Sequence, residues 1–220
     1  MKKRVLLTGG NRGIGLAIKT KLEATNLYEV ITPSSNVLDL SNIESIKKYC
    51  RDELKFDILI NNAGVNFIRK IEEITSNDIE TINNINLVAP LLLTQAVVKH
   101  MKINKWGKII NISSIWGVRS KEMRTLYSGT KFGIIGQTKA LSRELGPENI
   151  LVNAICPGYV MTDMTNSTVS KEEQEVIKES VPLKRFASPF EIAEMVEFLI
   201  SERNTYMTGQ TLVIDGGFTA

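Results

Sequence analysis

Short apolar, β-branched runs alternate along the chain with longer stretches in which apolar residues recur at helical spacing. The runs typical of strands are residues 5–8, 29–32, 37–40, 57–61, 108–113, 151–155 and 211–214. The helical patterns are residues 13–24, 43–54, 76–102, 127–145 and 189–201. This alternation predicts an α/β fold with a doubly wound, mostly parallel sheet of about six to seven strands.

Local signals refine the helices. Ser41 with Glu44, and Ser188 with Glu191, have the spacing of a capping box, which satisfies backbone N–H groups at a helix start. Pro90 predicts a break or kink just before it within 76–102. Residues 160–186 are polar and without a strand pattern, so we expect a surface insertion that acts as a substrate lid.

The link between the second and third runs is too short for parallel neighbours. Only residues 33–36 separate 29–32 from 37–40, whereas a parallel crossover needs a dozen or more residues and usually a helix. The sequence therefore predicts a tight link at 33–36, a short or irregular edge segment at 37–40, and the loss of one flanking helix.

Composition narrows the function classes. We interpret residues 1–220 as a single domain. The 27 Lys and Arg residues are interspersed with 24 Asp and Glu residues and form no basic stripe, which argues against a nucleic-acid partner. No signal core or apolar run of membrane-spanning length is present, so we expect a cytoplasmic protein without a membrane partner. Cys50 and Cys156 have no metal-ligand spacing, and no metal is expected.

A glycine-rich turn follows the first predicted strand and opens the first helix, in the order Thr8, Gly9, Gly10, Asn11, Arg12, Gly13, Ile14, Gly15. Glycines let the backbone approach a pyrophosphate, which then lies at the positive end of the helix. This context favours dinucleotide binding. Arg12 is either a cation for an additional phosphate or an ordinary solvated loop residue.

Two further patterns carry acid–base chemistry. Tyr127 and Lys131 are four residues apart on a predicted helix and so share one face. A nearby ammonium favours the phenolate, so we expect a lowered pKa at Tyr127 and an acid or base usable near neutrality. Ser114 ends a predicted strand at the edge where doubly wound sheets bind ligands; it either hydrogen-bonds a substrate oxygen or caps the following segment.

Together these motifs resemble the short-chain dehydrogenase/reductase family, whose fold is a Rossmann-type sheet, over nearly the whole chain. Ser114 precedes Tyr127 by 13 residues, as in the family. The other positions that match family motifs are Thr8, Gly9, Gly13, Gly15, Asn61, Asn62, Ala63, Gly64, Asn86, Lys131, Pro157, Gly158, Thr162, Gly209, Gln210, Asp215, Gly216 and Gly217.

The resemblance implies the roles of the site residues. Tyr127 would exchange a proton with the substrate oxygen, Ser114 would hydrogen-bond it, Lys131 would hold the cofactor ribose, and Asn86 would support a water chain. The expected cofactor-binding residues are Thr8, Gly9, Asn11, Arg12, Gly13, Ile14, Gly15, Ser34, Ser35, Asp39, Leu40, Asn62, Ala63, Gly64, Tyr127, Lys131, Pro157, Gly158, Val160 and Thr162.

The same resemblance bears on cofactor and substrate. Residues 32–35 contain no carboxylate to repel a 2′-phosphate, so NADP(H) is favoured over NAD(H). The pattern is nearest to 3-oxoacyl-acyl-carrier-protein reductases, in which two basic positions receive the carrier; one matches Lys105, but the other is Glu148. The resemblance thus implies an NAD(P)(H)-dependent oxidoreductase that transfers a hydride between nicotinamide and a carbonyl or secondary alcohol, with a 3-oxoacyl thioester as the expected substrate. A sugar or sugar-nucleotide substrate is the alternative, and a non-catalytic dinucleotide-binding regulator is the alternative of another class. The family also implies a homo-oligomer, a tetramer or dimer.

Overall fold

A single six-stranded parallel sheet forms the centre of the molecule, and the computed structural model describes residues 2–51, 54–162, 165 and 169–220. The strands are β1 (Lys3–Leu7), β2 (Tyr28–Ile31), β3 (Ile58–Asn61), β4 (Gly107–Ile112), β5 (Ile150–Pro157) and β6 (Thr211–Ile214). Their spatial order is β2-β1-β3-β4-β5-β6. The predicted α/β class and doubly wound sheet are confirmed.

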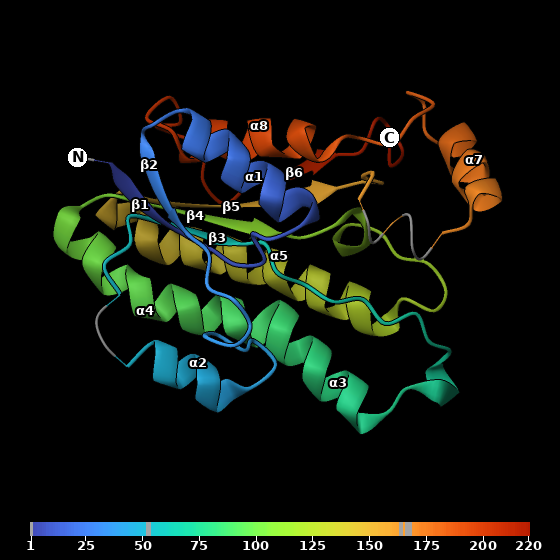
Figure 1. Ribbon diagram of the computed structural model, residues 1–220, viewed down its shortest axis with the longest axis horizontal. Helices are drawn as coiled ribbons and strands as arrows, with labels where there is room; N and C mark the ends of the chain where they lie inside the picture. Colours follow the sequence, from blue (N-terminus) through green and yellow to red (C-terminus); the bar gives the residue numbers. More distant parts are fainter. Residues whose placement is uncertain (1, 52–53, 163–164, 166–168) are drawn as a thin grey trace.

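Helices cover both faces of the sheet (Figure 1). Helices α1 (Gly13–Ala24) and α8 (Pro189–Ile200) lie on one face, and α4 (Ala89–Asn104) and α5 (Thr125–Leu145) lie on the other. Alternate side chains of β1 point to opposite faces of the sheet. Val5 and Leu7 pack against α1 and α8, while Leu6 packs on the face that α4 covers. All three are fully buried, as expected for a strand covered on both faces.

The short link predicted at residues 33–36 is a tight turn. The N–H groups of Val37 and Leu38 both donate to the carbonyl of Ser34, at 2.9 Å each. Residues 37–40 form no strand, so the strand assignment was wrong, whereas the prediction of an irregular segment without a preceding helix is confirmed. Leu38 is buried in the core beside α2 (Ile43–Tyr49), which anchors the segment and leaves β2 at the edge of the sheet.

Two details of α2 differ from the prediction. Its cap is Asn42, whose side chain accepts from the N–H groups of Glu44 and Ser45, because the hydroxyl of Ser41 is engaged with Asp39 at 2.7 Å. The helix ends at Tyr49 rather than at residue 54, and residues 52–53 lie outside the described part of the chain. At α8, by contrast, the capping box of Ser188 is confirmed.

The long pattern at 76–102 is interrupted. Helix α3 (Ser76–Asn83) passes through a π-helical turn, Asn84–Val88, into α4. Pro90 has no N–H to donate to the carbonyl four residues earlier, which accounts for the break that the sequence predicts. The stretch from Ser76 to Asn104 is apolar and long enough to cross a membrane by length and composition, but Leu93, Val97 and Met101 of α4 pack in the core under the sheet.

Residues 160–186 contain a helix that the sequence did not predict, α7 (Lys171–Ser180). Of its ten residues only Gln174 is buried, so an apolar periodicity is missing and the helix depends on a capping box at Ser170. The segment leaves the body at Val160 and returns at Ala187, where the two residues form a parallel bridge. Residues 163–164 and 166–168 of the expected lid lie outside the described residues.

Candidate active site

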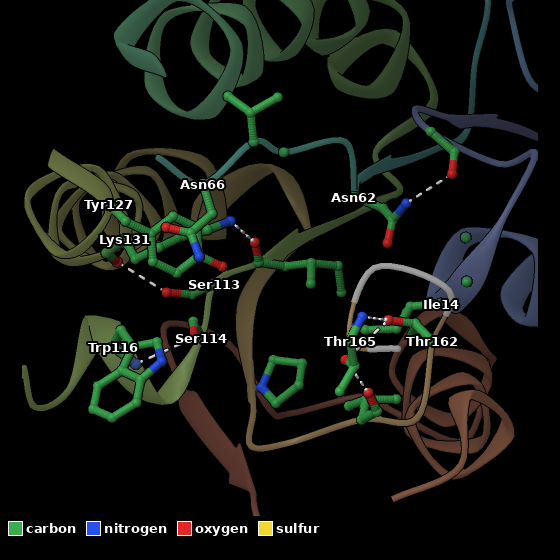
Figure 2. Close-up of a pocket in the computed structure, with 18 of the residues that line it drawn as sticks. Ile14, Asn62, Asn66, Ser113, Ser114, Trp116, Tyr127, Lys131, Thr162 and Thr165 are labelled. Carbon is green, nitrogen blue, oxygen red and sulfur yellow. Dashed lines mark hydrogen bonds between the residues drawn. The ribbon is translucent and has the colours of Figure 1, made fainter. Parts of the chain in front are cut away.

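A cavity of about 360 Å³ opens at the carboxyl ends of β1, β3, β4 and β5. It brings together most of the residues expected from the sequence, namely Gly9, Arg12, Gly13, Ile14, Gly15, Asn62, Ala63, Gly64, Ser114, Tyr127, Lys131, Pro157, Gly158, Val160 and Thr162. Figure 2 shows Ser114, Tyr127 and Lys131 on one side of the cavity and Ile14 and Thr162 on the other. The cavity is therefore long enough to join the glycine turn to the tyrosine.

Seven predicted residues are not part of the cavity wall. They are Thr8, Asn11, Ser34, Ser35, Asp39, Leu40 and Asn86. Asp39 uses its carboxylate locally, accepting from the N–H and the hydroxyl of Ser41 at 2.9 and 2.7 Å. Ser34 and Ser35 are exposed beyond the end of β2.

The glycine turn has the shape that a pyrophosphate requires. Gly9 and Gly13 have φ values of +67° and +53°, in the left-handed region that favours glycine. A Cβ atom at Gly15 would lie 2.0 Å from the carbonyl oxygen of Gly9, so no side chain fits there. The backbone thus forms an open cradle at the N-terminus of α1, and these residues fit the diphosphate of a dinucleotide.

Thr8 fixes this turn to the neighbouring loop. Its hydroxyl oxygen accepts hydrogen bonds from the backbone N–H groups of Asn62 and Ala63, at 3.0 and 3.1 Å. The Asn62 side chain returns hydrogen bonds to the carbonyls of Thr8 and Gly9, both at 3.0 Å. Thr8 therefore positions the cradle without lining it.

The predicted acid–base residues lie on two neighbouring elements. Ser114 follows β4 and forms the expected cap, since its oxygen accepts from the N–H of Trp116 at 3.2 Å; its side chain also lines the cavity. Tyr127 and Lys131 lie one turn apart on α5, with the Lys131 nitrogen 5.5 Å from the centre of the Tyr127 ring. Lys131 donates to the carbonyl of Ile112 at 2.8 Å (Figure 2).

Burial sets the pKa of both groups. It raises the pKa of Tyr127, opposite to the expected direction, and interaction with the Ser114 side chain and the Arg124 charge only partly offsets this. Burial also lowers the pKa of Lys131 to about 8. The expectation failed because sequence spacing gives the distance between the two side chains but not the loss of water around the phenol.

Asn86 lies in the π-helical turn, and its side chain hydrogen-bonds the backbone of the adjoining loop at Val65. Its side chain accepts from the N–H of Val65 at 2.9 Å and donates to the Val65 carbonyl at 2.8 Å and to the Thr130 hydroxyl at 3.1 Å. A Cβ atom at Gly64 would lie 3.4 Å from Asn86 Oδ1 and 3.5 Å from Lys131 Nζ. Glycine at position 64 thus leaves space between these two polar groups.

Sequence reasoning missed a second group of lining residues: Val65, Asn66, Ile112, Ser113, Trp116, Arg124, Tyr159, Thr165 and Val169. Arg124 precedes Tyr127 by three residues, so helical spacing could have placed it on the same face. Trp116 packs edge-on against Tyr159, with ring centres 6.4 Å apart, and no short motif signals that contact.

Comparison with known proteins identifies the family. Residues 11–219 match the sequence model of a family described as enoyl-(acyl carrier protein) reductase. The chain is 37% identical to the 3-oxoacyl-[acyl-carrier-protein] reductase FabG of Aquifex aeolicus (strain VF5), over 96% of this chain and 95% of that protein. The chain belongs to the short-chain dehydrogenase/reductase family.

Other proteins similar to this short-chain dehydrogenase/reductase include a second reductase and two solved structures with a bound nicotinamide cofactor. The corresponding FabG of Rickettsia felis is 34% identical, over 98% of this chain and 96% of its own. The structure of a 4-hydroxyisoleucine dehydrogenase mutant complexed with NADH and succinate is 32% identical, with a TM-score of 0.91, and covers 99% of this chain and 98% of its own. ElxO with NADP bound is 28% identical, with a TM-score of 0.90, and covers 99% of each chain. The protein is an NAD(P)-dependent oxidoreductase.

Proposed function

We propose that the protein reduces a carbonyl compound to a secondary alcohol, with Tyr127 as the proton donor. The carbonyl carbon takes up the hydride that a bound nicotinamide supplies, and the carbonyl oxygen takes the proton of the Tyr127 hydroxyl. A phenol whose pKa burial raises remains protonated near neutrality, which suits a donor rather than a base. The observation that carries the proposal is that Ser114 and Tyr127 line one cavity with the glycine cradle.

Ser114 and Lys131 support this step in different ways. The Ser114 side chain faces the phenol and is placed to donate a hydrogen bond to the same substrate oxygen, which stabilises the charge developing there. Lys131, with a pKa of about 8, gives up a proton more easily than an ordinary lysine. It is the group placed to bind the ribose and to return a proton towards Tyr127, while Asn86 holds the loop at Val65 beside it.

The preferred cofactor in this proposal is NADP(H). Arg12 lines the cavity at the N-terminus of α1 and is exposed, so its guanidinium can meet an added phosphate. Thr32 ends the second strand region with a hydroxyl that accepts from the N–H of Gly10 at 3.2 Å, in place of a carboxylate. Ser34 and Ser35 follow it and remain our proposed contacts to the adenosine end.

For the substrate, the curated relatives support a 3-oxoacyl thioester. One feature argues against delivery by an acidic carrier protein: the ammonium of Lys105 forms an ion pair with the carboxylate of Glu148, which lowers the pKa of that carboxyl. The basic position is therefore neutralised by its neighbour. The likeness to 4-hydroxyisoleucine dehydrogenase supports a small substrate, and a sugar or sugar-nucleotide remains the alternative.

The test compares cofactors and substrates in one assay. NADPH and NADH are titrated first, and oxidation is then followed with a 3-oxoacyl carrier-protein thioester, the matching N-acetylcysteamine thioester and a panel of small ketones and sugars. We expect NADPH oxidation with a small carbonyl, and no gain in kcat/KM when the thioester is attached to carrier protein. Failure of every carbonyl with both cofactors would refute the proposed reaction, and a large carrier-dependent gain would refute the small-substrate preference.

Two further family properties are proposed for this chain. Leu91 of α4 and Phe132 of α5 are exposed apolar residues on helices through which relatives assemble, and they support a homo-oligomer, a tetramer or dimer. Light scattering at working concentration tests this, and a monomer would contradict it. The bacterial reductases among the relatives support a cytoplasmic location, which fractionation of cells would test.

A further inference from the structure

Arg124 lies beside the proposed proton donor and has no partner of its own in the described structure. It precedes Tyr127 by three residues at the start of α5 and lines the same cavity. Its Nε and Nη1 atoms are buried and make no hydrogen bond to any described residue. As the residue flanking the start of α5 it makes no side-chain cap, so the helix does not depend on its guanidinium.

Other arginines in the described residues contrast with Arg124. Arg185 forms a two-pronged pair with Glu191, with N–O distances of 2.8 and 2.7 Å, and Arg203 pairs with Glu197. In both pairs the arginine side chain is exposed, where a guanidinium costs little. Arg124 is half-buried, and its two buried nitrogen atoms lack the hydrogen bonds that buried polar atoms normally make, so a ligand in the cavity is the partner they await.

The surroundings of Arg124 indicate the charge and shape of that ligand. Burial lowers the pKa of Arg124, and the neighbouring titratable groups are the phenols of Tyr127 and Tyr159, which are neutral near pH 7, and the carboxylate of Glu122. An arginine stays protonated even so. A planar cation with two available donors fits a carboxylate, which it binds through two parallel hydrogen bonds.

A second unsatisfied group faces the same space. Asn66 lines the cavity near Tyr127 and Lys131 (Figure 2), and its Oδ1 atom is buried without a hydrogen-bond partner among the described residues. This amide oxygen accepts a hydrogen bond from a hydroxyl or N–H group. Trp116 and Tyr159 supply an apolar wall of the cavity.

We propose that Arg124 binds a carboxylate of the substrate, so that the enzyme acts on a short oxo acid and the corresponding hydroxy acid. The carboxylate lies within a few bonds of the reacting carbonyl, because Arg124 is one helical turn from Tyr127. Asn66 accepts from a further polar group of the same substrate. This inference rests on the proposed reaction at Tyr127 and, within the small-carbonyl preference proposed above, assigns free acids as the substrate class.

Matched substrates and variants test the assignment. NADPH and NADH oxidation is measured with 3-oxobutanoate and 4-oxopentanoate and with the methyl ester of each, using the wild type, Arg124→Gln and Arg124→Lys. Arg119→Gln is the control, because Arg119 is exposed, lies 5.1 Å from the centre of the Phe218 ring and does not line the cavity. Thermal melting of each variant confirms folding.

The wild type is expected to prefer each acid to its ester. Arg124→Gln should lower kcat/KM for the acids by about 10- to 100-fold more than for the esters, mainly through KM, since a charged hydrogen bond of this kind contributes about 1.5–3 kcal/mol. Arg124→Lys should recover part of the loss and Arg119→Gln should change neither substrate. Equal losses for acid and ester, or a wild type that prefers the ester, would overturn the inference.

A binding measurement separates this inference from the proposed reaction. The chain has two tryptophans, and Trp106→Phe leaves Trp116 of the cavity wall as the only fluorophore of that kind. Butanoate and butanamide are titrated into this variant with and without Arg124→Gln. Tighter binding of butanoate that Arg124→Gln removes supports the carboxylate site even if no carbonyl is turned over, whereas equal binding of the two compounds refutes it.

Discussion

The Lys131 ammonium donates to the carbonyl of Ile112 at 2.8 Å and lies 5.5 Å from the centre of the Tyr127 ring. The lysine is therefore held beside the tyrosine, but it does not offset the effect of burial on the pKa of the phenol. Desolvation therefore governs both groups: it raises the pKa of the phenol and lowers that of the amine. Around neutral pH the site holds a protonated tyrosine next to a lysine that releases its proton readily. This arrangement leads to the first two predictions.

Tyr127→Phe should lower kcat by at least about 100-fold, because it removes the group placed to give the proton while keeping the ring. Affinity for NADPH, measured by fluorescence titration, should stay within a factor of a few of the wild type. Tyr206→Phe is the control, since the Tyr206 side chain is 96% exposed. Substantial turnover by Tyr127→Phe would show that another group donates the proton.

Lys131→Met should change how stability depends on pH. Because the pKa of Lys131 is about 8 in the folded protein and near 10.5 unfolded, the unfolded chain binds the extra proton between these values. The free energy of unfolding of the wild type therefore gains a contribution that rises with pH across this window, and the variant lacks it. We expect the variant to be the more stable protein at pH 7 and its advantage to shrink by pH 9.5.

Urea denaturation of both proteins at pH 7, 8, 9 and 9.5 measures this difference. Burial also lowers the pKa of Lys108, but that lysine is present in both proteins and its contribution cancels in the comparison. A constant difference in unfolding free energy across the range would mean that the lysine keeps its ordinary pKa.

Gly15→Ala should disrupt the cradle at the start of α1. The new Cβ would lie 2.0 Å from the Gly9 carbonyl oxygen, so the turn must shift, and we expect about a tenfold or greater loss of NADPH affinity together with a lower Tm. Gly136→Ala on α5 is the matched control, because its Cβ meets nothing within 4 Å, and an alanine should raise helix stability by about 0.5–1 kcal/mol. Calorimetric titration with NADPH distinguishes the two outcomes.

Arg12→Gln should weaken NADPH binding by about tenfold or more and leave NADH binding nearly unchanged, because only NADPH carries the extra phosphate. Parallel titrations with the two cofactors make NADH the internal control. A variant that loses affinity for both cofactors equally would place Arg12 on the shared pyrophosphate instead.

The sequence predicted the parts of the site that depend on short spacing along the chain. The glycine turn needs Gly9 and Gly13 at positive φ, and Tyr127 and Lys131 need only one helical turn between them. The residues it missed are joined by tertiary contacts. Arg124 is distinguished by two buried nitrogen atoms without a hydrogen-bond partner among the described residues, and its neighbours in sequence do not reveal this.

In the fold, too, the sequence predicted the features set by local pattern and missed those set by tertiary contacts. The alternating apolar runs sufficed for the sheet, and the short link at 33–36 was enough to exclude a helix there. Residues 37–40 remained ambiguous because Val37 and Leu38 are both apolar, yet in the structure Val37 is 60% exposed and Leu38 only 4%. Helix α7 was not predicted because its charged sequence has almost no buried face, and so shows no apolar residues at helical spacing.

The irregular segment at 37–40 also leaves β2 as an exposed edge strand of the sheet. Without a strand beyond it in the described residues, β2 presents unpaired backbone groups that another chain could pair with, a common origin of aggregation. Three features limit this: β2 has only four residues, Glu29 places a charge on it within 3.5 Å of Arg4, and Pro33 lacks the N–H needed to extend the ladder. The short link therefore leaves β2 at the edge of the sheet, but with an edge that is protected against pairing with another chain.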